Sequence, residues 1–582
     1  MSFIKTIEND IKTIINKCGY EIDTVTLAIS NRPDLGEYQL NDAMKLAKKY
    51  GKNPRLIAEE IVSVLLNDNR FINVNIAGAG FINISFDNNY LMECMNKMIE
   101  DVYTNIDKAS PKKIILDYGG ANVAKALHVG HLRSANIGEA LKRLANLLGI
   151  ETYADAHLGD WGRPIGLVML EIKKRNPSLP YFDESFEGEY SDVSPVTNDD
   201  LMELYPYASS KAKIDEIYME EARQMTVDFQ NRKKGLIALW NHIMNVSKKD
   251  IKRIYDKLNT TFEIWNGESD EDKYIPEMVE YLENKGLVET SQGAKIIEVK
   301  EEDDDHEVPP LLLVKSNGGA SYETTDLACI WGRVKEYNPD EIWYLTDARQ
   351  ALHFEQVFRA ARKSNIVNDN TKLEFIPFGT MNGSDGKPFK TRDGGVMKLE
   401  DLLELAYVEC EKKILPNITG EERKNIAEKV SVAAVKYADL IPNRLTDYVF
   451  DPIKFSDLEG KTGPYLLYST IRMKSLLRKA NEQGIKYSKI EKMIGTSDRE
   501  VMLNIMNLAD SLTKSYESKS LNEISDYIYK LTSAFNKFYS ENRVLDEKDI
   551  DIRSSWLALT KLTLDINLII LDVLGIQCPE KM

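Results

Sequence analysis

Two stretches far apart in the sequence repeat a strand–helix–strand pattern, and this repetition constrains the fold more than any other feature. In the first stretch, the apolar runs 113–119 and 151–156 flank a segment with apolar residues at helical spacing. In the second, the runs 341–345 and 373–379 flank the helical pattern of 351–364. Strands joined by helices form a parallel sheet that helices cover on both faces. We therefore predict an α/β, Rossmann-like domain built from both stretches.

The rest of the chain lies on either side of this pattern and between its halves. Residues 1–108 combine helical periodicity with an alternating hairpin pattern at 71–86, which is typical of an α+β domain. Residues from about 171 to 318 are polar, acidic and helical, and we predict that they form an insertion in the α/β domain. From 406 to 582 almost every segment has helical periodicity. The predicted domains are 1–108, 109–405 and 406–582.

The composition excludes several classes of protein. With 43% apolar and 29% charged residues, the 582-residue chain is typical of soluble globular proteins of several domains. The apolar run 566–576 contains Asp572, so we expect a core helix there and no membrane span. The N-terminus lacks the apolar core of a signal peptide, and we expect a cytoplasmic protein. The net charge of −17 disfavours nonspecific nucleic-acid binding, and the five cysteines form no CxxC, so we expect no metal site.

Polar clusters follow all four predicted strands, and they hold most of the scarce histidines. The clusters read DYGGANVAKALHVGH, HLGDWG, TDARQALH and GTMNGSDGKPFKTRDGG in chain order. Because ligands of an open parallel sheet bind beyond the carboxyl ends of its strands, we expect the clusters to share one site. The chain has six histidines, and four of them fall here: His128, His131, His157 and His353.

The first cluster leads into a helix at a pair of histidines. Helix N-termini present unpaired N–H groups and a partial positive charge, which attract phosphate. His128 and His131 lie three residues apart on the first turn and project on the same side, so both can donate to one phosphate chain. Gly130 has no side chain, and a flat base can lie against the backbone there.

The cluster after the last strand combines four glycines with three cations, which is typical of a mobile basic loop. Such a loop can close on a triphosphate and neutralise the charge that develops on departing pyrophosphate. It is not a Walker P-loop, because GxxxxGK[ST] is absent. The cations are Lys387, Lys390 and Arg392.

These motifs resemble those of a known family. The HxGH sequence is similar to the HIGH signature of class I aminoacyl-tRNA synthetases. The longer string NVAKALHVGHLRS, with GDWG and GKPFKTR, resembles arginyl-tRNA synthetases. GEYQLNDAMKLAKKYGKNP and GAGFINI resemble the N-terminal domain of that family, and AVKYADL, DYVFD and EGKTGPYLLYSTIR resemble its helical anticodon-binding domain. The resemblance covers nearly the whole chain and is weakest in 171–318.

The resemblance implies an arginine–tRNA ligase that serves protein synthesis. Such an enzyme activates L-arginine with ATP to arginyl-adenylate and transfers it to the 3′-terminal adenosine of tRNA(Arg). This chemistry relies on positioning and charge stabilisation. Mg2+ is implied by the family, although the sequence contains no dedicated ligand cage. The residues implied in catalysis are Lys125, His128, His131, Lys387 and Lys390, and those implied in ATP binding are His128, Gly130, His131, His353 and Lys390.

By motif position, the family's arginine pocket falls on five residues. A guanidinium is planar and charged with five donors, so its pocket needs carboxylates and other acceptors. Asp326 would face the guanidinium, and Asp117 is the candidate for a second carboxylate there. Asn122 and Gln350 would hold the backbone end of arginine, and Tyr322 would form a wall. We expect this pocket to disfavour lysine, which would leave buried carboxylates badly paired.

The sequence departs from the family pattern at two places. The KMSK loop is present only as KPFK (387–390), or as PFKT ending on Thr391 in another register. In members that lack the last lysine, a lysine just before the HIGH element is thought to substitute, and Lys125 stands there. Arg163 and Pro164 follow GDWG where many relatives carry Thr-Gln, which puts in doubt the role of that loop.

The tRNA needs a second surface, and residues 461–492 offer cations interspersed with tyrosines. This combination suits backbone contact and stacking on unpaired anticodon bases, although a charged, solvated helix face is the alternative interpretation. The candidate tRNA-binding residues are Tyr465, Tyr468, Arg472 and Arg478. We expect tRNA(Arg), arginine and ATP as partners of a monomer, with no membrane and no DNA partner.

Two other functions remain as alternatives. A noncatalytic tRNA-binding or regulatory paralogue would have no use for an ATP site, so the intact HxGH and the basic loop count against it. Another class I synthetase, such as that for cysteine, is disfavoured because the chain has no zinc-like cysteine cluster.

Overall fold

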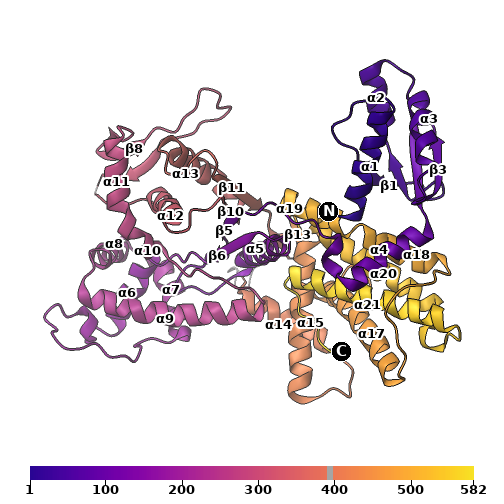
Figure 1. Cartoon of the computed structure of the whole chain (residues 1–582). Coiled ribbons are helices and arrows are strands. Elements are labelled where there is room, and N and C mark those ends of the chain that lie inside the picture. Colours follow the sequence, from indigo (N-terminus) through magenta and orange to yellow (C-terminus); the bar gives the residue numbers. More distant parts are fainter. Residues whose placement is uncertain (317, 384, 388, 390–396) are drawn as a thin grey trace.

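The computed structural model describes residues 1–582 except 317, 384, 388 and 390–396. Its centre is a parallel four-stranded sheet in the order β11-β10-β5-β6, with a helical domain on one side and the N-terminal domain beyond it (Figure 1). Both strand–helix–strand stretches contribute two strands, which confirms the predicted parallel sheet. The strands are β5 (Lys113–Asp117), β6 (Glu151–Asp155), β10 (Glu341–Asp347) and β11 (Lys372–Phe378).

Helices cover both faces of this sheet, because successive strand residues point to opposite sides. Ile114 and Leu116 of β5 pack into the core that includes helix α5 (Val129–Leu147). Ile115 between them packs into the core of the other face, with helices α12 (Tyr322–Tyr337) and α13 (Ala351–Lys363). The sequences of these strands are therefore continuous apolar runs, because both faces of the sheet are buried.

The N-terminal domain has its own antiparallel sheet in the order β1-β2-β4-β3. The alternating pattern at 71–86 forms the predicted hairpin, with Ala77 of β3 paired to Phe81 of β4 across the Gly-Ala-Gly turn. The helices bury their apolar faces, for example Ile7, Ile11 and Ile15 of the first one. The elements are α1 (Phe3–Lys17), β1 (Leu27–Ile29), β2 (Tyr38–Leu40), α2 (Asp42–Tyr50), α3 (Pro54–Leu65), β3 (Phe71–Ala77), β4 (Phe81–Phe86) and α4 (Asn88–Glu100).

Between β6 and β10 the chain forms helices and a small antiparallel sheet, β7-β8-β9. The acidic run at 301–305 lies between β8 and β9, but it is not wholly solvated: Asp304 is almost buried and pairs with Arg359 of α13 at 2.6 Å. The elements are α6 (Arg163–Arg175), α7 (Asn198–Ala212), α8 (Glu216–Gln230), α9 (Lys234–Lys257), α10 (Glu268–Glu271), α11 (Ile275–Asn284), β7 (Glu289–Ser291), β8 (Ala294–Ile297) and β9 (Leu311–Val314).

The C-terminal part is helical, apart from a short parallel pairing of β12 (Met381–Asn382) with β13 (Tyr448–Val449). None of the described helices is long and apolar enough to span a membrane. The helices are α14 (Leu399–Glu411), α15 (Gly420–Leu440), α16 (Pro452–Phe455), α17 (Gly463–Glu482), α18 (Thr496–Met506), α19 (Leu508–Ser518), α20 (Asn522–Glu541) and α21 (Ile550–Val573).

A buried polar network joins α5 to α15 and so connects the sheet domain to the helical domain. The Arg133 guanidinium on α5 lies 2.9 Å from the Asp439 carboxylate on α15, and both side chains are almost fully buried. Asn136, one turn further along α5, donates to the other oxygen of Asp439 at 2.8 Å. Nearby, burial lowers the pKa of Lys436 to about 8, and its ammonium donates to the carbonyl of Leu258.

We predict that Asp439→Ala lowers the free energy of unfolding by about 3–5 kcal/mol, because it leaves the Arg133 charge buried without a partner. Urea denaturation followed by circular dichroism measures this change. The double variant Arg133→Met/Asp439→Leu is the control, and it should lose much less because neither charge remains. Equal losses in the two variants would contradict this account.

Candidate functional site

The polar clusters that follow the four strands meet at one edge of the sheet. Because the strands are parallel, Asp117 of β5, Asp155 of β6 and Asp347 of β10 all stand at carboxyl ends. Ser134 on α5 accepts from the backbone of Gly119 at 2.9 Å and donates to the carbonyl of Leu345 at 2.7 Å. The start of α5 is thereby bonded to the ends of two neighbouring strands.

The two histidines of the HxGH sequence hold each other at the start of α5. His128 is the N-cap residue, and its Nδ1 accepts from the backbone N–H of Gly130 at 3.1 Å. Nδ1 of His131 accepts in turn from the backbone N–H of His128 at 3.0 Å. A Cβ at Gly130 would lie 2.8 Å from the His128 ring, so a larger residue there would displace this ring.

This arrangement also determines where the imidazole protons are. Burial, together with the charge of Lys125, lowers the pKa of His128 below its usual value, and burial and His128 lower that of His131 to about 3. Both rings are therefore neutral at pH 7. Because each Nδ1 accepts a backbone N–H, the single ring proton lies on Nε2 in both. The pair offers two neutral N–H donors at a helix N-terminus.

The residues that directly follow the basic loop lie beside these histidines. Val129 donates to the carbonyl of Met397 at 3.1 Å, and Leu399 donates to that of Leu127 at 2.9 Å. Lys387 is exposed on the other flank. Lys390 lies outside the described residues, as do Arg392 and Thr391, so the register of the KMSK-like loop stays a prediction.

Lys125, the residue predicted to substitute for a loop lysine, stands three residues before His128. Its ammonium lies over the Tyr205 ring of α7, 4.5 Å from the ring centre. Its charge acts on both histidines, since it contributes to lowering their pKa values.

Asp326 and His353 form an ion pair between α12 and α13. Nε2 of the histidine lies 2.5 Å from Oδ2 of the aspartate, and both side chains are mostly buried. Burial opposes protonation of the ring, but the hydrogen bond and charge of Asp326 outweigh it and raise the pKa of His353. The histidine predicted to bind ATP therefore contacts the aspartate predicted to bind arginine.

Asp117 is also paired, with an arginine of the chain itself. Nη2 of Arg333, on α12, lies 2.6 Å from Oδ2 of Asp117 and 2.6 Å from Oδ2 of Asp155. Arg333 is 4% exposed, so a buried cation joins the ends of β5 and β6. The same acidic strand end also holds His157, whose backbone N–H donates to Oδ1 of Asp155 at 3.0 Å.

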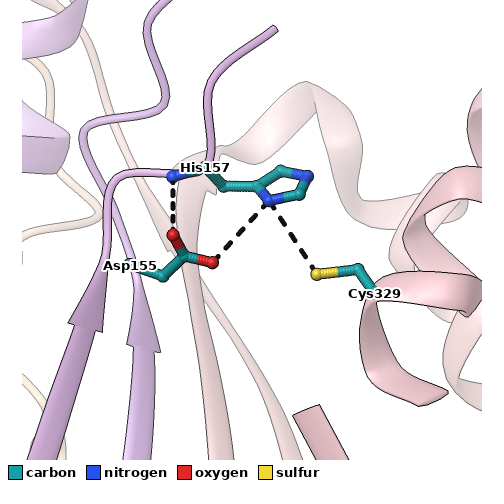
Figure 2. Close-up of side chains that lie close together, drawn as sticks. All are labelled: Asp155, His157 and Cys329. Carbon is teal, nitrogen blue, oxygen red and sulfur yellow. Dashed lines mark hydrogen bonds and ion pairs between the residues drawn. The ribbon is translucent and has the colours of Figure 1, made fainter. Parts of the chain in front are cut away.

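Figure 2 shows that Cys329, which comes from α12, lies next to His157 and Asp155. Its Sγ lies 3.9 Å from Nδ1 of His157, which itself lies 3.7 Å from Oδ2 of Asp155. His157 has a backbone φ of +24°, which turns the chain sharply where β6 ends.

The remaining predicted arginine-pocket residues are exposed. Tyr322 is the first residue of α12, is 63% exposed and lines a cavity of about 460 Å³ with Trp161 and Glu268. Asn122 is exposed beside Gly159, and Gln350 is the exposed N-cap residue of α13.

Two residues of this region were missed by the sequence analysis. Burial, with the charges of Asp160 and Asp326, raises the pKa of Glu268 to about 7, although His157 acts in the opposite direction. Glu268 lies in the stretch that we interpreted only as an insertion. Arg333 has the sequence context of an ordinary charged helix position, and no local signal marks it as buried.

The candidate tRNA surface lies mainly on α17. Arg472 lies over the rings of Tyr468 and Tyr539, at 4.9 and 5.3 Å from their centres, beside a groove of about 210 Å³. The Tyr465 hydroxyl instead accepts from Asn536 at 2.9 Å and is part-buried. Arg478 is exposed, 4.0 Å from Glu482.

Acids from other segments pair with many cations of 461–492. Lys461 pairs with Asp526 and Lys474 with Glu580, each at 2.6 Å. Lys492 pairs with Asp549 at 2.9 Å. The surface is therefore less basic than its sequence, and the residues of the Arg472 groove are the part that combines a cation with open aromatic rings.

A parallel sheet with a histidine pair at its first helix N-terminus, a basic loop beside it and a helical C-terminal domain defines a class I aminoacyl-tRNA synthetase. The family description "tRNA synthetases class I (R), catalytic domain" matches residues 93–452. The descriptions "Arginyl tRNA synthetase N terminal domain" and "DALR anticodon binding domain" match residues 5–86 and 466–582. The chain belongs to the arginyl-tRNA synthetase family.

Relatives support this assignment over the whole chain. Proteins named arginine–tRNA ligase from Alkaliphilus oremlandii and Agathobacter rectalis are 45% and 44% identical, each over 100% of this chain and 99% of the relative. The crystal structure of arginyl-tRNA synthetase from Plasmodium falciparum superimposes with a TM-score of 0.80 at 25% identity, over 100% of both chains. The Thermus thermophilus enzyme has the same fold, with a TM-score of 0.78 at 18% identity.

We predict that His353 titrates above pH 6.5 in the folded protein and below it in Asp326→Asn, where burial acts without the carboxylate. The stability that this pair contributes is complete below the unfolded pKa of about 6.5 and is lost as the pH rises through the folded pKa. Imidazole NMR resonances recorded against pH measure both values. A wild-type His353 pKa at or below 6.5 would contradict the ion pair.

Proposed function

We propose that the reaction of this arginine–tRNA ligase takes place at the carboxyl edge of the parallel sheet, in two steps. The carboxylate of arginine attacks the α-phosphate of ATP, which gives arginyl-adenylate and pyrophosphate. The 3′-terminal ribose of tRNA(Arg) then takes the arginyl group and AMP leaves. The observation that supports this proposal is the antiparallel backbone bridge between His128 and Lys398, in which Val129 donates to Met397 and Leu399 donates to Leu127, because the described end of the basic loop then lies against the histidine pair.

In this proposal, ATP lies over the start of α5. The Nε2–H groups of His128 and His131 donate to its phosphates, and the base lies against Gly130. Lys125 and the loop residues Lys387 and Lys390 stabilise the charge that develops on pyrophosphate. The neutral state of both imidazoles supports this role, because each then keeps one outward donor and its backbone bond together.

Mg2+ supplies charge neutralisation on the phosphates when it is bound. It prefers oxygen ligands and several waters. Among the described residues, the one group of side chains spaced to hold a metal ion contains a cysteine and a histidine, which does not suit Mg2+. The donor set therefore fits Mg2+ that enters on the ATP phosphates rather than in a protein cage.

The arginine side chain would enter between carboxylates that internal cations already orient. His353 holds one oxygen of Asp326 and Arg333 holds one oxygen of Asp117, so each aspartate keeps its other oxygen for the substrate guanidinium. Glu268 beside Tyr322 adds a third carboxyl group, whose pKa is raised to about 7 by burial and by the charges of Asp160 and Asp326.

Asn122 and Gln350 are proposed to hold the α-amino and carboxylate groups of arginine. Both are exposed at the mouth of the sheet edge, which suits contacts with the polar end of an amino acid. Lysine would leave the fork of carboxylate oxygens partly unpaired, so the pocket selects against it.

For tRNA(Arg), we propose that unpaired anticodon bases stack on Tyr468 in the Arg472 groove. Arg478 lies close to the phosphate backbone of the tRNA, and Tyr465 holds Asn536 in place. The exposed Tyr468 ring and the Arg472 guanidinium that lies over it support this role. We further propose that the enzyme acts as a monomer in the cytoplasm, where aminoacylated tRNA is consumed.

Aminoacylation of total tRNA with each of the twenty amino acids tests the function. We expect incorporation of arginine only, with pyrophosphate exchange that requires arginine, ATP and tRNA together. Robust exchange with lysine or cysteine would overturn the assignment of the substrate.

Asp326→Asn should raise the KM for arginine by about 100-fold, equivalent to roughly 3 kcal/mol, because it removes a buried charge from the guanidinium. Steady-state aminoacylation measures KM for arginine and for ATP separately. Asp347→Asn is the matched control, since Asp347 stands at the same edge but pairs with Arg349. An unchanged KM for arginine in Asp326→Asn would show that the pocket lies elsewhere.

His128→Asn separates the two tasks of the N-cap residue. Asparagine supplies a side-chain oxygen as the capping acceptor in place of Nδ1, so the free energy of unfolding should change by no more than about 0.5 kcal/mol. The Nε2–H donor of the imidazole is lost, and the rate of pyrophosphate exchange should fall by about 100-fold. Comparable loss of stability and activity would mean that the histidine serves only the helix.

A further inference from the structure

Asp155, His157 and Cys329 bring three different ligand atoms together in a buried place (Figure 2). The carboxylate comes from the end of β6, the imidazole from the loop after it and the thiol from α12 on the other side of the edge. Their atoms all lie within 4.8 Å of one another. The side chains of Asp155 and His157 are 2% and 12% exposed, and Cys329 is 1% exposed.

The spacing is close to that of a tetrahedral metal site. With bonds of about 2.0–2.1 Å to nitrogen and oxygen and 2.3 Å to sulfur, tetrahedral ligand atoms are separated by roughly 3.3–3.6 Å. Nδ1 of His157 lies 3.7 Å from Oδ2 of Asp155 and 3.9 Å from Sγ of Cys329. Shifts of a few tenths of an ångström would bring these two pairs to that spacing, and the third pair, the Asp155 carboxylate and Sγ of Cys329, already lies within 4.8 Å.

Buried polar atoms around the group lack partners. Among the described residues, no hydrogen bond reaches Nε2 of His157, Nε or Nη1 of Arg333, or Oε2 of Glu271. Glu271 is 3% exposed, and its Oε2 would be 3.0 Å from a Cβ at Gly332, which places it against the same helix as Cys329. Such atoms indicate a place that accommodates a further polar or charged species.

Charge also permits a divalent ion here. The thiolate of Cys329, formed when the ion displaces the thiol proton, and the carboxylate of Asp155 together balance two positive charges. Arg333 and Asp117 remain as a second, mutually neutral pair. Oδ2 of Asp155 keeps a lone pair for Arg333 while it binds the ion with another, as carboxylate ligands commonly do.

We propose that Asp155, His157 and Cys329 form a site for a borderline-soft divalent cation of the Zn2+ class, with a fourth position left to water. A mixed nitrogen, sulfur and oxygen donor set favours Zn2+ or Co2+ over Mg2+ and Ca2+. The site is distinct from the Mg2+ that accompanies ATP.

Occupation of this site opposes arginine binding, an inference that rests on the proposed pocket. The ion binds the oxygen that Arg333 also contacts, and Arg333 is the cation that orients Asp117. Repulsion between the ion and the guanidinium of Arg333 disturbs the orientation of Asp117. We expect the dissociation constant for arginine to rise roughly tenfold.

Absorption spectroscopy with Co2+ tests the site on the intact protein. We expect one Co2+ per chain, visible d–d bands of tetrahedral intensity and a thiolate-to-cobalt charge-transfer band, all displaced by Zn2+ but not by Mg2+. Cys329→Ser and His157→Gln should each lose these bands while retaining wild-type circular dichroism. Cys410→Ser is the matched control, a buried cysteine on another helix, and should keep them.

The outcomes separate the two parts of the inference. Absence of the charge-transfer band in the wild type, or its persistence in Cys329→Ser, would overturn the metal site. Calorimetry of arginine binding, without ATP or tRNA, then measures the linked effect with and without Zn2+. A site that binds Co2+ but leaves the dissociation constant for arginine unchanged would overturn the inhibition alone, and failure of arginine to bind at all would instead count against the proposed pocket.

Discussion

The position of helix α5 is the constraint on which the rest of the molecule depends. Its first residues must face the open sheet edge, while its remaining surface is buried by three parts of the chain. Ser134 bonds it to two strand ends, and Arg133 pairs with Asp439 of the helical domain. Glu139, fully buried further along, accepts from Tyr118 and from the backbone of Thr261 in the insertion. Buried charges tolerate little displacement, so these contacts hold the histidine pair in one place.

In the arginine pocket proposed above, electrostatic recognition would depend on charges that the protein supplies to itself. Carboxylates meant for a guanidinium would repel one another in the empty pocket, and some would become protonated. Arg333 and His353 reduce this repulsion by each holding one oxygen of an aspartate. The remaining oxygens are then presented at defined positions. In this proposal the guanidinium would bind the remaining oxygens as a planar fork, which a single ammonium cannot do.

The insertion contributes more to this edge than its sequence indicates. Glu268 lines the cavity beside Tyr322, and the loop between β8 and β9 packs on α13 through Asp304 and Arg359. Since α13 carries His353, this loop supports one of the two internal cations. A segment that separates the two halves of the sheet in sequence thus helps to hold their ends together.

Local patterns were sufficient to predict much of this protein. The four strands, the hairpin at 71–86 and the histidine pair at a helix start follow from apolar periodicity and from the chemistry of helix ends, which act over a few residues. The family resemblance rested on the same short strings. The bonds that the two imidazoles accept from the backbone of Gly130 and His128 are local as well, and the spacing of His128 and His131 already allowed both rings to point one way.

Only the tertiary structure decided which charges meet. Arg333 pairs with Asp117 and Asp155, more than 170 residues away, and Lys461 and Lys474 pair with acids that lie outside the basic stretch. Cys329 meets His157 across the sheet edge for the same reason. Charge pairing depends on distance in space and on exclusion of water, and neither is set by neighbours in sequence. The sequence alone determined the elements and the chemistry at strand ends, whereas packing determined which side chains are buried together there.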